Sequence, residues 1–323
     1  MIGAQQVVDI VLAEARRRGR ADETIVLVTD RVDAALRWAN NTMTTNGEST
    51  SRTTTVISIV RRDGQAYVGS VRSSAVAPSV LMDLVVASQA AAAAASPARD
   101  SAPALPPDAA PTDWDAPSPR TGVDAFGGVA DALTRGFAGR ETLFGYARHV
   151  VETTFVATST GLRRRFTQPT GSVEINAKRD GASAWAGVST PDFVDVPTDA
   201  MLEDLATRLS WAQRSVELPA GRYETIMPPS TVADMMIYLS WTMGGRGAQE
   251  GRTALSAPGG GTRVGEKLTS LPLTLYSDPH APGLQCTPFV AVSGSSERAS
   301  VFDNGMPIER VDWIRDGARN ALA

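Results

Sequence analysis

Histidine, a frequent ligand of catalytic zinc, occurs twice in this chain of 323 residues, at His149 and His280. A hydrolytic zinc site uses three protein ligands and leaves one position open for water. A helix that supplies two imidazoles needs them about one turn apart, whereas these two histidines lie more than a third of the chain apart. We therefore predict no metal ligands and no catalytic residues of a zinc hydrolase in this chain.

Cys286, the one cysteine, is the other candidate nucleophile. A catalytic thiolate needs a base, and His280 lies a few residues before it. Two such residues close in sequence are weak evidence of a site, so an inert thiol is the preferred interpretation. A single cysteine excludes an internal disulfide and fits a reducing cytoplasm. A Ser-His-Asp triad stays open, although no Gly-x-Ser-x-Gly motif supports one.

Phosphate binding is suggested superficially by the glycine-rich stretch Ala257–Lys267. In a phosphate loop the lysine directly follows the last glycine and precedes a serine or threonine. Here Glu266 separates Gly265 from the lysine, and leucine follows it, which favours a flexible surface loop. We interpret the cluster Arg163–Arg165 as a solvated strand end. With a net charge of -4, the chain is not expected to bind nucleic acid.

Two aspartates stand in short motifs rich in glycine or proline. Asp278 precedes a proline, and Asp303 precedes an asparagine and a glycine. Aspartate and asparagine at such positions close turns through bonds from their side chains to the backbone. We predict structural turn roles, and not acid–base catalysis, for Asp278, Asp303, Asn304 and Gly305. The residues that bind substrate stay unassigned.

The composition is that of a soluble globular protein, with 42% hydrophobic and 20% charged residues. The length suggests two or three domains. The N-terminus lacks the basic segment and long apolar run of a signal peptide. The longest apolar stretch, 80–95, is interrupted by Asp83 and Gln89 and is too short to span a bilayer. We therefore expect a cytoplasmic protein that does not contact membranes.

Residues 1–96 are predicted to form an α/β unit with a hairpin. Gln5–Arg18 has one apolar face, basic residues in its last turn and Gly19 as a left-handed cap, which predicts a helix. Asp63-Gly64 between two β-prone runs indicates the hairpin. The other elements expected are strands at 24–29, 53–62 and 65–72 and a helix at 80–95, with a polar stretch, 40–51, that has no hydrophobic period.

A linker and a central antiparallel unit follow. Residues 97–121 contain seven of the twenty prolines, so we predict a Pro/Ala-rich linker or a long exposed loop. Residues 122–218 are predicted to be a meander of short strands, broken by turn signals such as Pro169–Gly171. Strands and helices that do not alternate as β-α-β favour an α+β fold. The expected strands are 143–147, 149–158, 162–167, 172–178 and 183–188, between helices at 123–137 and 198–214.

Residues 219–323 form the last predicted unit. A helix is expected to begin with Ser230 as its N-cap and to end at Gly244-Gly245. Its Met235 and Met236 lie on one face with valine and leucine, a pattern typical of core packing and not of metal ligation. The expected strands are 223–227, 271–276 and 289–292, followed by a hairpin closed by Asp316-Gly317.

Several segments, in the same order along the chain, resemble the TldD/PmbA metallopeptidase family. Active members hold zinc with two histidines of a His-Glu-x-x-x-His helix, whereas the corresponding helix here carries no histidine. Within the family the chain is similar to the PmbA (TldE) branch of high-GC actinobacteria. The resembling segments are Arg37–Asn41, the hairpin 51–71, Tyr146–His149, Ser159–Arg163, Gln168–Gly171, Gly221–Trp241, Gly261–Leu268, Tyr276–Gly283 and Ser300–Ile314.

This resemblance implies an α+β fold of three successive units and a cytoplasmic heterodimer that degrades or processes peptides. In such an assembly the TldD-like subunit holds zinc, and the PmbA-like subunit completes the substrate channel. We thus expect no cofactor in this chain, zinc in a TldD-like partner, and a peptide substrate. The family's third domain continues past the point where this chain stops, so an incomplete C-terminal domain is expected. The alternatives are a stand-alone hydrolase with a non-metal nucleophile such as Cys286, or a binding or scaffold protein of the gyrase-modulator or toxin–antitoxin type.

Overall fold

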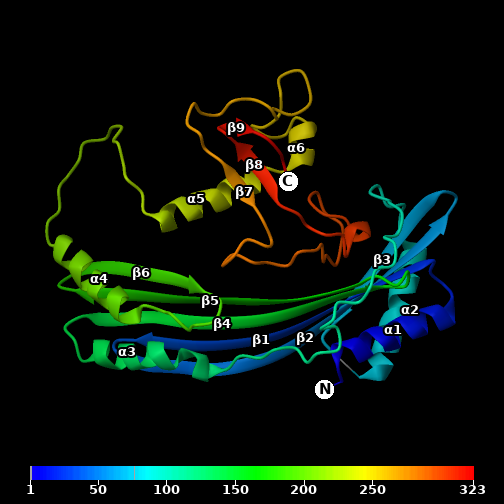
Figure 1. The fold of residues 1–323 in the computed structure, drawn as a ribbon, viewed down its shortest axis with the longest axis horizontal. Coiled ribbons are helices and arrows are strands. Elements are labelled where there is room, and N and C mark those ends of the chain that lie inside the picture. Colours follow the sequence, from blue (N-terminus) through cyan, green and yellow to red (C-terminus); the bar gives the residue numbers. More distant parts are fainter. Residues whose placement is uncertain (1, 76) are drawn as a thin grey trace.

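A six-stranded antiparallel sheet dominates the computed structural model, which describes residues 2–75 and 77–323 (Figure 1). Its strand order is β3-β2-β1-β4-β5-β6, so the N-terminal and central units share one sheet with β1 and β4 paired at its centre. This antiparallel sheet with flanking helices confirms the predicted α+β class. The strands are β1 (Glu23–Ala39), β2 (Thr42–Arg62), β3 (Gln65–Ser73), β4 (Thr142–Thr158), β5 (Arg163–Arg179) and β6 (Ala182–Thr190).

The polar stretch 40–51 contains the turn between β1 and β2 and the first half of β2. This hairpin is missing from the sequence prediction because the stretch has no hydrophobic period. Asn40 and Asn41 have φ angles of 51° and 57°, as a two-residue hairpin turn of type I′ requires. Residues 42–51 are exposed, yet they pair with β1, with one register shift opposite Arg37 and Trp38. Backbone hydrogen bonds form the ladder here, so the strand needs no apolar face.

β4 and β5 are continuous, so the predicted breaks at Arg148 and at Pro169–Gly171 are wrong. β6 pairs with β5 only from Gly171 onward. Residue 169 therefore lies on a stretch of β5 with β4 as its one strand neighbour among the described residues. Proline lacks an N–H and is tolerated where a strand is at the edge of a sheet, which explains why the strand runs through it.

Helices cover one face of the sheet in two groups (Figure 1). One group is α1 (Ala4–Arg18) with α2 (Pro78–Ala94), and the other is η1 (Val123–Phe126), α3 (Gly127–Phe137) and α4 (Thr198–Trp211). Each group encloses a core, and burying each large apolar side chain contributes about 1.5–3 kcal/mol. The first core includes Val7, Val8, Val11, Val56, Leu81, Val85 and Phe155, and the second includes Leu36, Trp38, Leu133, Leu143, Ile175, Leu205 and Leu209.

Residues 97–121 contain no helix or strand, but they pack on the sheet. The N–H of Ala98 donates to the carbonyl of Ala66 in β3 over 2.8 Å. Arg164 forms an ion pair of 2.7 Å with Asp108, and Arg165 pairs with another linker aspartate. The side chain of Arg165 is only 4% exposed. The interpretation of this arginine cluster as a solvated strand end is therefore wrong, because the arginines hold the linker.

The C-terminal unit lies over the face of the sheet opposite the helices (Figure 1). Its anchor is apolar: Phe289, Val301 and Phe302 are at most 4% exposed and share one core cluster with Ile57 and Ile59 of β2. The elements of this unit are α5 (Pro229–Thr242), α6 (Gly245–Gln249), β7 (Leu275–Ser277), η2 (Val301–Asp303), β8 (Val311–Arg315) and β9 (Ala318–Arg319), with the sheet order β7-β8-β9.

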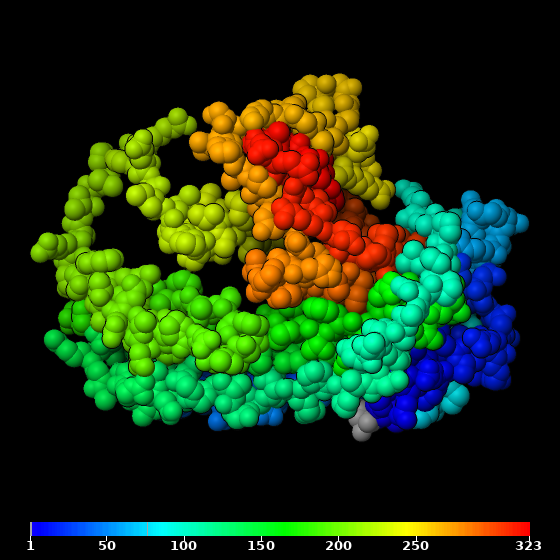
Figure 2. Space-filling view, viewed as in Figure 1, coloured from blue at the N-terminus to red at the C-terminus, as the bar shows by residue number. Residues whose placement is uncertain are grey.

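Strand predictions for this unit are wrong in two places, and of the predicted strand 271–276 only residues 275 and 276 lie in a strand, β7. Residues 223–227 are not a strand, because no strand among the described residues lies beside them, and Ile226 is 100% exposed. Residues 289–292 make one isolated bridge, between Phe289 and Pro307. Figure 2 shows the segment that leads from α4 to α5 arching away from the body of the protein, and the residues between 212 and 228 are exposed.

α5 also differs from its prediction. Its N-cap is Pro228 and not Ser230, and none of its residues is buried. Met235 is 50% exposed and Met236 is 37% exposed, so the methionine stripe is not core packing among the described residues. No helix in the described parts of the chain is both long and apolar enough to cross a bilayer.

Candidate functional site

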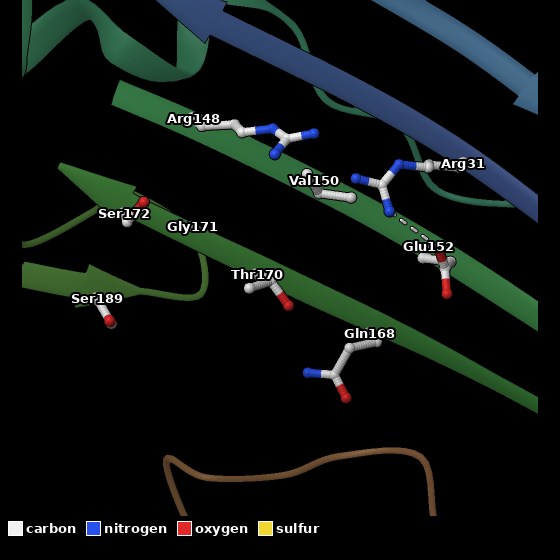
Figure 3. Close-up of a pocket in the computed structure, with 9 residues that line it drawn as sticks. All are labelled: Arg31, Arg148, Val150, Glu152, Gln168, Thr170, Gly171, Ser172 and Ser189. Carbon is white, nitrogen blue, oxygen red and sulfur yellow. Dashed lines mark hydrogen bonds and ion pairs between the residues drawn. The ribbon is translucent and has the colours of Figure 1, made fainter. Parts of the chain in front are cut away.

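A polar groove lies between the sheet face opposite the helices and the C-terminal unit. It consists of three adjoining cavities of about 350, 510 and 820 Å³, which share lining residues from β5 and β6. Residues 283–285 line its middle, and residues 230–234 at the start of α5 line one end. Figure 3 shows the first of these cavities, lined by residues of β1, β4, β5 and β6.

Four charged side chains from β1 and β4 form a network on this face. Arg31 donates to Glu152 over 3.1 Å and to Asp33 over 3.2 Å. Arg148 binds Asp33 through two of its nitrogens, with 3.0 Å between Nε and Oδ1. The hydrogen bonds from Arg148 and then Arg31 lower the pKa of Asp33. Two cations balance two anions, so this part of the groove offers no surplus charge for a phosphate.

The floor of the groove presents amide and hydroxyl groups. Thr170, Ser172 and Ser189 lie on β5 and β6, beside Gln168. Nε2 of Gln168 donates to the carbonyl of Gln285 over 3.1 Å and so joins the sheet to the C-terminal unit. Its buried Oε1 has no hydrogen-bond partner among the described residues. A buried acceptor without a partner costs free energy.

The opposite end of the groove is lined by aromatic and charged side chains. Glu174 accepts hydrogen bonds from Tyr146 Oη at 2.6 Å and from Trp185 Nε1 at 3.3 Å. The hydrogen bond from the Tyr146 hydroxyl to the carboxylate of Glu174 raises the pKa of Tyr146. Trp185 is 41% exposed and faces the same cavity as Asp234 of α5. This end therefore offers an aromatic surface beside polar groups.

Neither histidine stands among other side chains that could complete a metal site in the described structure. His149 is buried at the side of the sheet that carries the helices, where its ring nitrogens contact Thr121 Oγ1 at 2.6 Å and the carbonyl of Pro191 at 2.8 Å. His280 is exposed in a loop. Within residues 2–75 and 77–323, no group of three or more His, Cys, Asp or Glu side chains is placed to hold a metal ion. α5 carries no histidine or cysteine, and its one carboxylate, Asp234, does not supply the three ligands of a hydrolytic zinc site.

Cys286 and His280 share one loop. The N–H of Cys286 donates to the carbonyl of Pro279 over 3.1 Å, which closes the loop. The thiol is exposed, and no hydrogen bond to an imidazole is formed within the described residues. The geometry thus supplies no base for the thiol.

The predicted turn residues lie outside the groove lining. The carboxylate of Asp278 accepts from the N–H of His280 over 2.9 Å, and the carbonyl of Asp303 accepts from the N–H of Met306 over 2.8 Å. Asn304 is 1% exposed and bonds to both backbone groups of Val292. Gly305 has a φ of 91°, and a Cβ on it would lie 2.4 Å from Leu162.

Sequence reasoning did not find the groove residues, because their spacing has no one-dimensional signature. Arg31 and Arg148 come together through pairing of distant strands. The one local signal is alternation at the start of β4, where Tyr146 and Arg148 are exposed between the buried Ala147 and His149.

Comparisons with known proteins match the C-terminal third of the chain to a family model and the whole chain to a known fold. Residues 220–322 match the family model for the PmbA/TldA metallopeptidase C-terminal domain. A search of curated proteins returned no match. The fold is similar to that of TldE from Thermococcus kodakarensis, with a TM-score of 0.72 and 16% identity over 98% of this chain and 69% of that one.

Two further solved structures share the fold. A putative modulator of a DNA gyrase from Thermotoga maritima has a TM-score of 0.68 and 13% identity, over 98% of this chain and 70% of that one. A putative modulator of DNA gyrase from Bacteroides thetaiotaomicron has a TM-score of 0.70 and 13% identity, over 100% and 72%. Residues 220–322 thus match the C-terminal domain of the PmbA/TldA metallopeptidase family, and the chain shares its fold with TldE and with the two gyrase-modulator structures.

Proposed function

We propose that this chain is a non-catalytic subunit of a cytoplasmic TldD/PmbA-type metallopeptidase complex that processes peptides. In this proposal a TldD-like paralogue holds the zinc ion and performs hydrolysis. The observation that carries the proposal is the composition of α5, which has no imidazole although it lies in the family's C-terminal domain. Asp234 is the one side chain of this helix of a type that commonly binds zinc, and a hydrolytic site needs three protein ligands, so no catalytic step is assigned to this chain.

The groove supports a role in holding the peptide. Its hydroxyl and amide groups are suited to backbone N–H and carbonyl groups, and Gln168 Oε1 is an acceptor without a partner in the described structure. The charges of Arg31, Asp33, Arg148 and Glu152 are paired with one another. A groove of this kind favours an extended backbone over a particular charged side chain.

The test is reconstitution with a zinc-bearing paralogue. The chain alone is expected to contain far less than one equivalent of zinc and to leave a quenched fluorescent peptide uncut, whereas the mixture cuts it. In the mixture, Gln168→Ala should raise KM several-fold with little change in kcat, because it removes the bridge to Gln285 and one acceptor. The matched control is Gln65→Ala at the start of β3, which should leave KM unchanged. Zinc-dependent cleavage by the chain alone would refute the proposal.

The alternative of a stand-alone hydrolase rests on one observation, the shared loop of Cys286 and His280. A thiol nucleophile requires both side chains, so either Cys286→Ala or His280→Ala must abolish such an activity. If the chain alone cleaves a peptide and either variant removes that cleavage, the hydrolase is the correct function.

A further inference from the structure

β6 is an open edge of the large sheet. It pairs with β5 and with no other described strand. The opposite edge, β3, is closed by the linker through the bond from Ala98 to Ala66. β6 spans nine residues without a charged side chain, a proline or a register shift. Natural sheets normally protect an exposed edge with one of these features, so an unprotected strand of this length indicates a surface that another strand covers.

The backbone groups that face outward can be identified from the β5–β6 turn. Asp180 and Gly181 have φ angles of 50° and 80°, which makes a type I′ turn closed by Arg179 and Ala182. The closing pair is hydrogen-bonded, and bonded and non-bonded pairs then alternate. The residues whose N–H and carbonyl groups point away from β5 are therefore Ser183, Trp185, Gly187 and Ser189.

An independent contact agrees with this assignment. Arg208 of α4 donates from Nη1 to the carbonyl of Trp185 over 3.1 Å, so this carbonyl is reachable from outside the ladder. Arg208 and its ion-pair partner Asp204 are both partly exposed beside the edge. A flexible side chain now occupies a position where a neighbouring strand would place an N–H.

We propose that β6 is an interface at which two copies of this chain pair antiparallel, related by a two-fold axis at Ala186. In this register Ser183 of one copy faces Ser189 of the other, and Trp185 faces Gly187. Each of the four facing pairs exchanges two N–H···O bonds. The two six-stranded sheets then form one continuous sheet. This inference goes beyond the proposed function, although Trp185, Gly187 and Ser189 also line the 820 Å³ end of the groove.

Side-chain sizes favour a second copy in this register. A Cβ on Gly187 would lie 2.4 Å from the ring of Trp185, so the indole already covers this glycine. Across the axis the two indoles, each lying over its own Gly187, stand next to each other and can form an aromatic pair. On the other face Ala184, Ala186 and Val188 pack against the core of α3 and α4, and all three are small enough for strands to approach closely.

Charge also favours self-pairing. β6 is uncharged, so no like charges meet across the ladder. Each copy brings the ion pair of Asp204 and Arg208, 2.7 Å apart, to the edge. Because both signs are present in each copy, a two-fold arrangement brings no net repulsion to the junction.

The test is the molar mass of the full chain, measured by light scattering over a wide range of concentrations. The wild type is expected to move from 34.1 kDa toward twice that value as concentration rises. The double variant Ser183→Lys with Ser189→Lys places like charges opposite each other and should remain at 34.1 kDa. The matched double variant Ser183→Lys with Ser189→Glu places opposite charges there and should dimerise at least as well as the wild type.

Hydrogen exchange provides a second readout that folding defects do not mimic. The amides of Ser183, Trp185, Gly187 and Ser189 should gain protection in the wild type at high concentration, whereas those of Ala184 and Ala186 are protected at all concentrations by β5. The proposal is overturned if the wild type stays at 34.1 kDa, as it would if a paralogue or a peptide strand covers β6, or if both lysines leave a dimer intact.

Discussion

Phe302→Ala should loosen the attachment of the C-terminal unit to the sheet and thereby open the groove. Phe302 is 4% exposed in the cluster that contains Ile57 and Ile59 of β2. Replacing a buried phenylalanine by alanine removes its transfer free energy and leaves a cavity, which together cost about 3–5 kcal/mol. The guanidinium of Arg61 lies 5.8 Å from the ring centroid and adds roughly 0.5–1 kcal/mol to this loss.

Ile226→Ala is the matched control, since this apolar side chain is 100% exposed. Its replacement should change the free energy of unfolding by less than about 0.5 kcal/mol. Urea denaturation measures both variants, and limited proteolysis reports whether the segment around residue 285 is cut faster in Phe302→Ala. A loss below about 1 kcal/mol, or equal losses in the two variants, would contradict the assignment of this cluster as the anchor.

Three further predictions concern packing, pH and the thiol. Gly69→Ala should destabilise the fold by about 1–3 kcal/mol, because a Cβ there would lie 2.2 Å from the backbone of α2. The control Gly47→Ala has open space around it and should leave the free energy of unfolding nearly unchanged in the same denaturation assay. Asp33→Asn should lower the free energy of unfolding by roughly 1 kcal/mol at pH 7, because paired carboxylates on a partly exposed face contribute modestly. The pKa of Asp33 is lowered in the folded protein, so the stability that its carboxylate contributes is present above the unfolded pKa near 3.9 and is lost as the pH falls through the folded value. The stabilities of wild type and variant should therefore converge in acid. Cys286→Ala should leave peptide cleavage by the reconstituted complex unchanged, and a loss of more than about tenfold would assign the thiol a role in catalysis.

Local patterns predicted the regular parts of the fold well. The helix ending at Gly19 and the hairpins at Asp63-Gly64 and Asp316-Gly317 have short-range signals, and the structure confirms them with positive φ angles at these turns. The Asn40-Asn41 hairpin carried a similar signal, but the exposed strand after it has no apolar period. Periodicity reports burial, so it is silent where a strand is held by its backbone alone.

Long-range packing explains the remaining differences. Pro169 indicated a break in the strand. It lies on a stretch of β5 that pairs with β4 alone in the described structure, so the N–H that proline lacks is not needed by a second neighbouring strand. Residues 223–227 have β-prone side chains, yet a strand needs a partner, and the described residues provide none. The groove combines residues of four strands, and no spacing along one strand encodes such a combination.

The proposed division of labour is tested by the zinc content and peptidase activity of the purified chain, each measured with and without a TldD-like paralogue. We expect well under one equivalent of zinc and no cleavage for the chain alone, and zinc-dependent cleavage when the paralogue is added. One equivalent of zinc in the chain alone, with peptide cleavage that a chelator abolishes, would contradict the proposed division of labour.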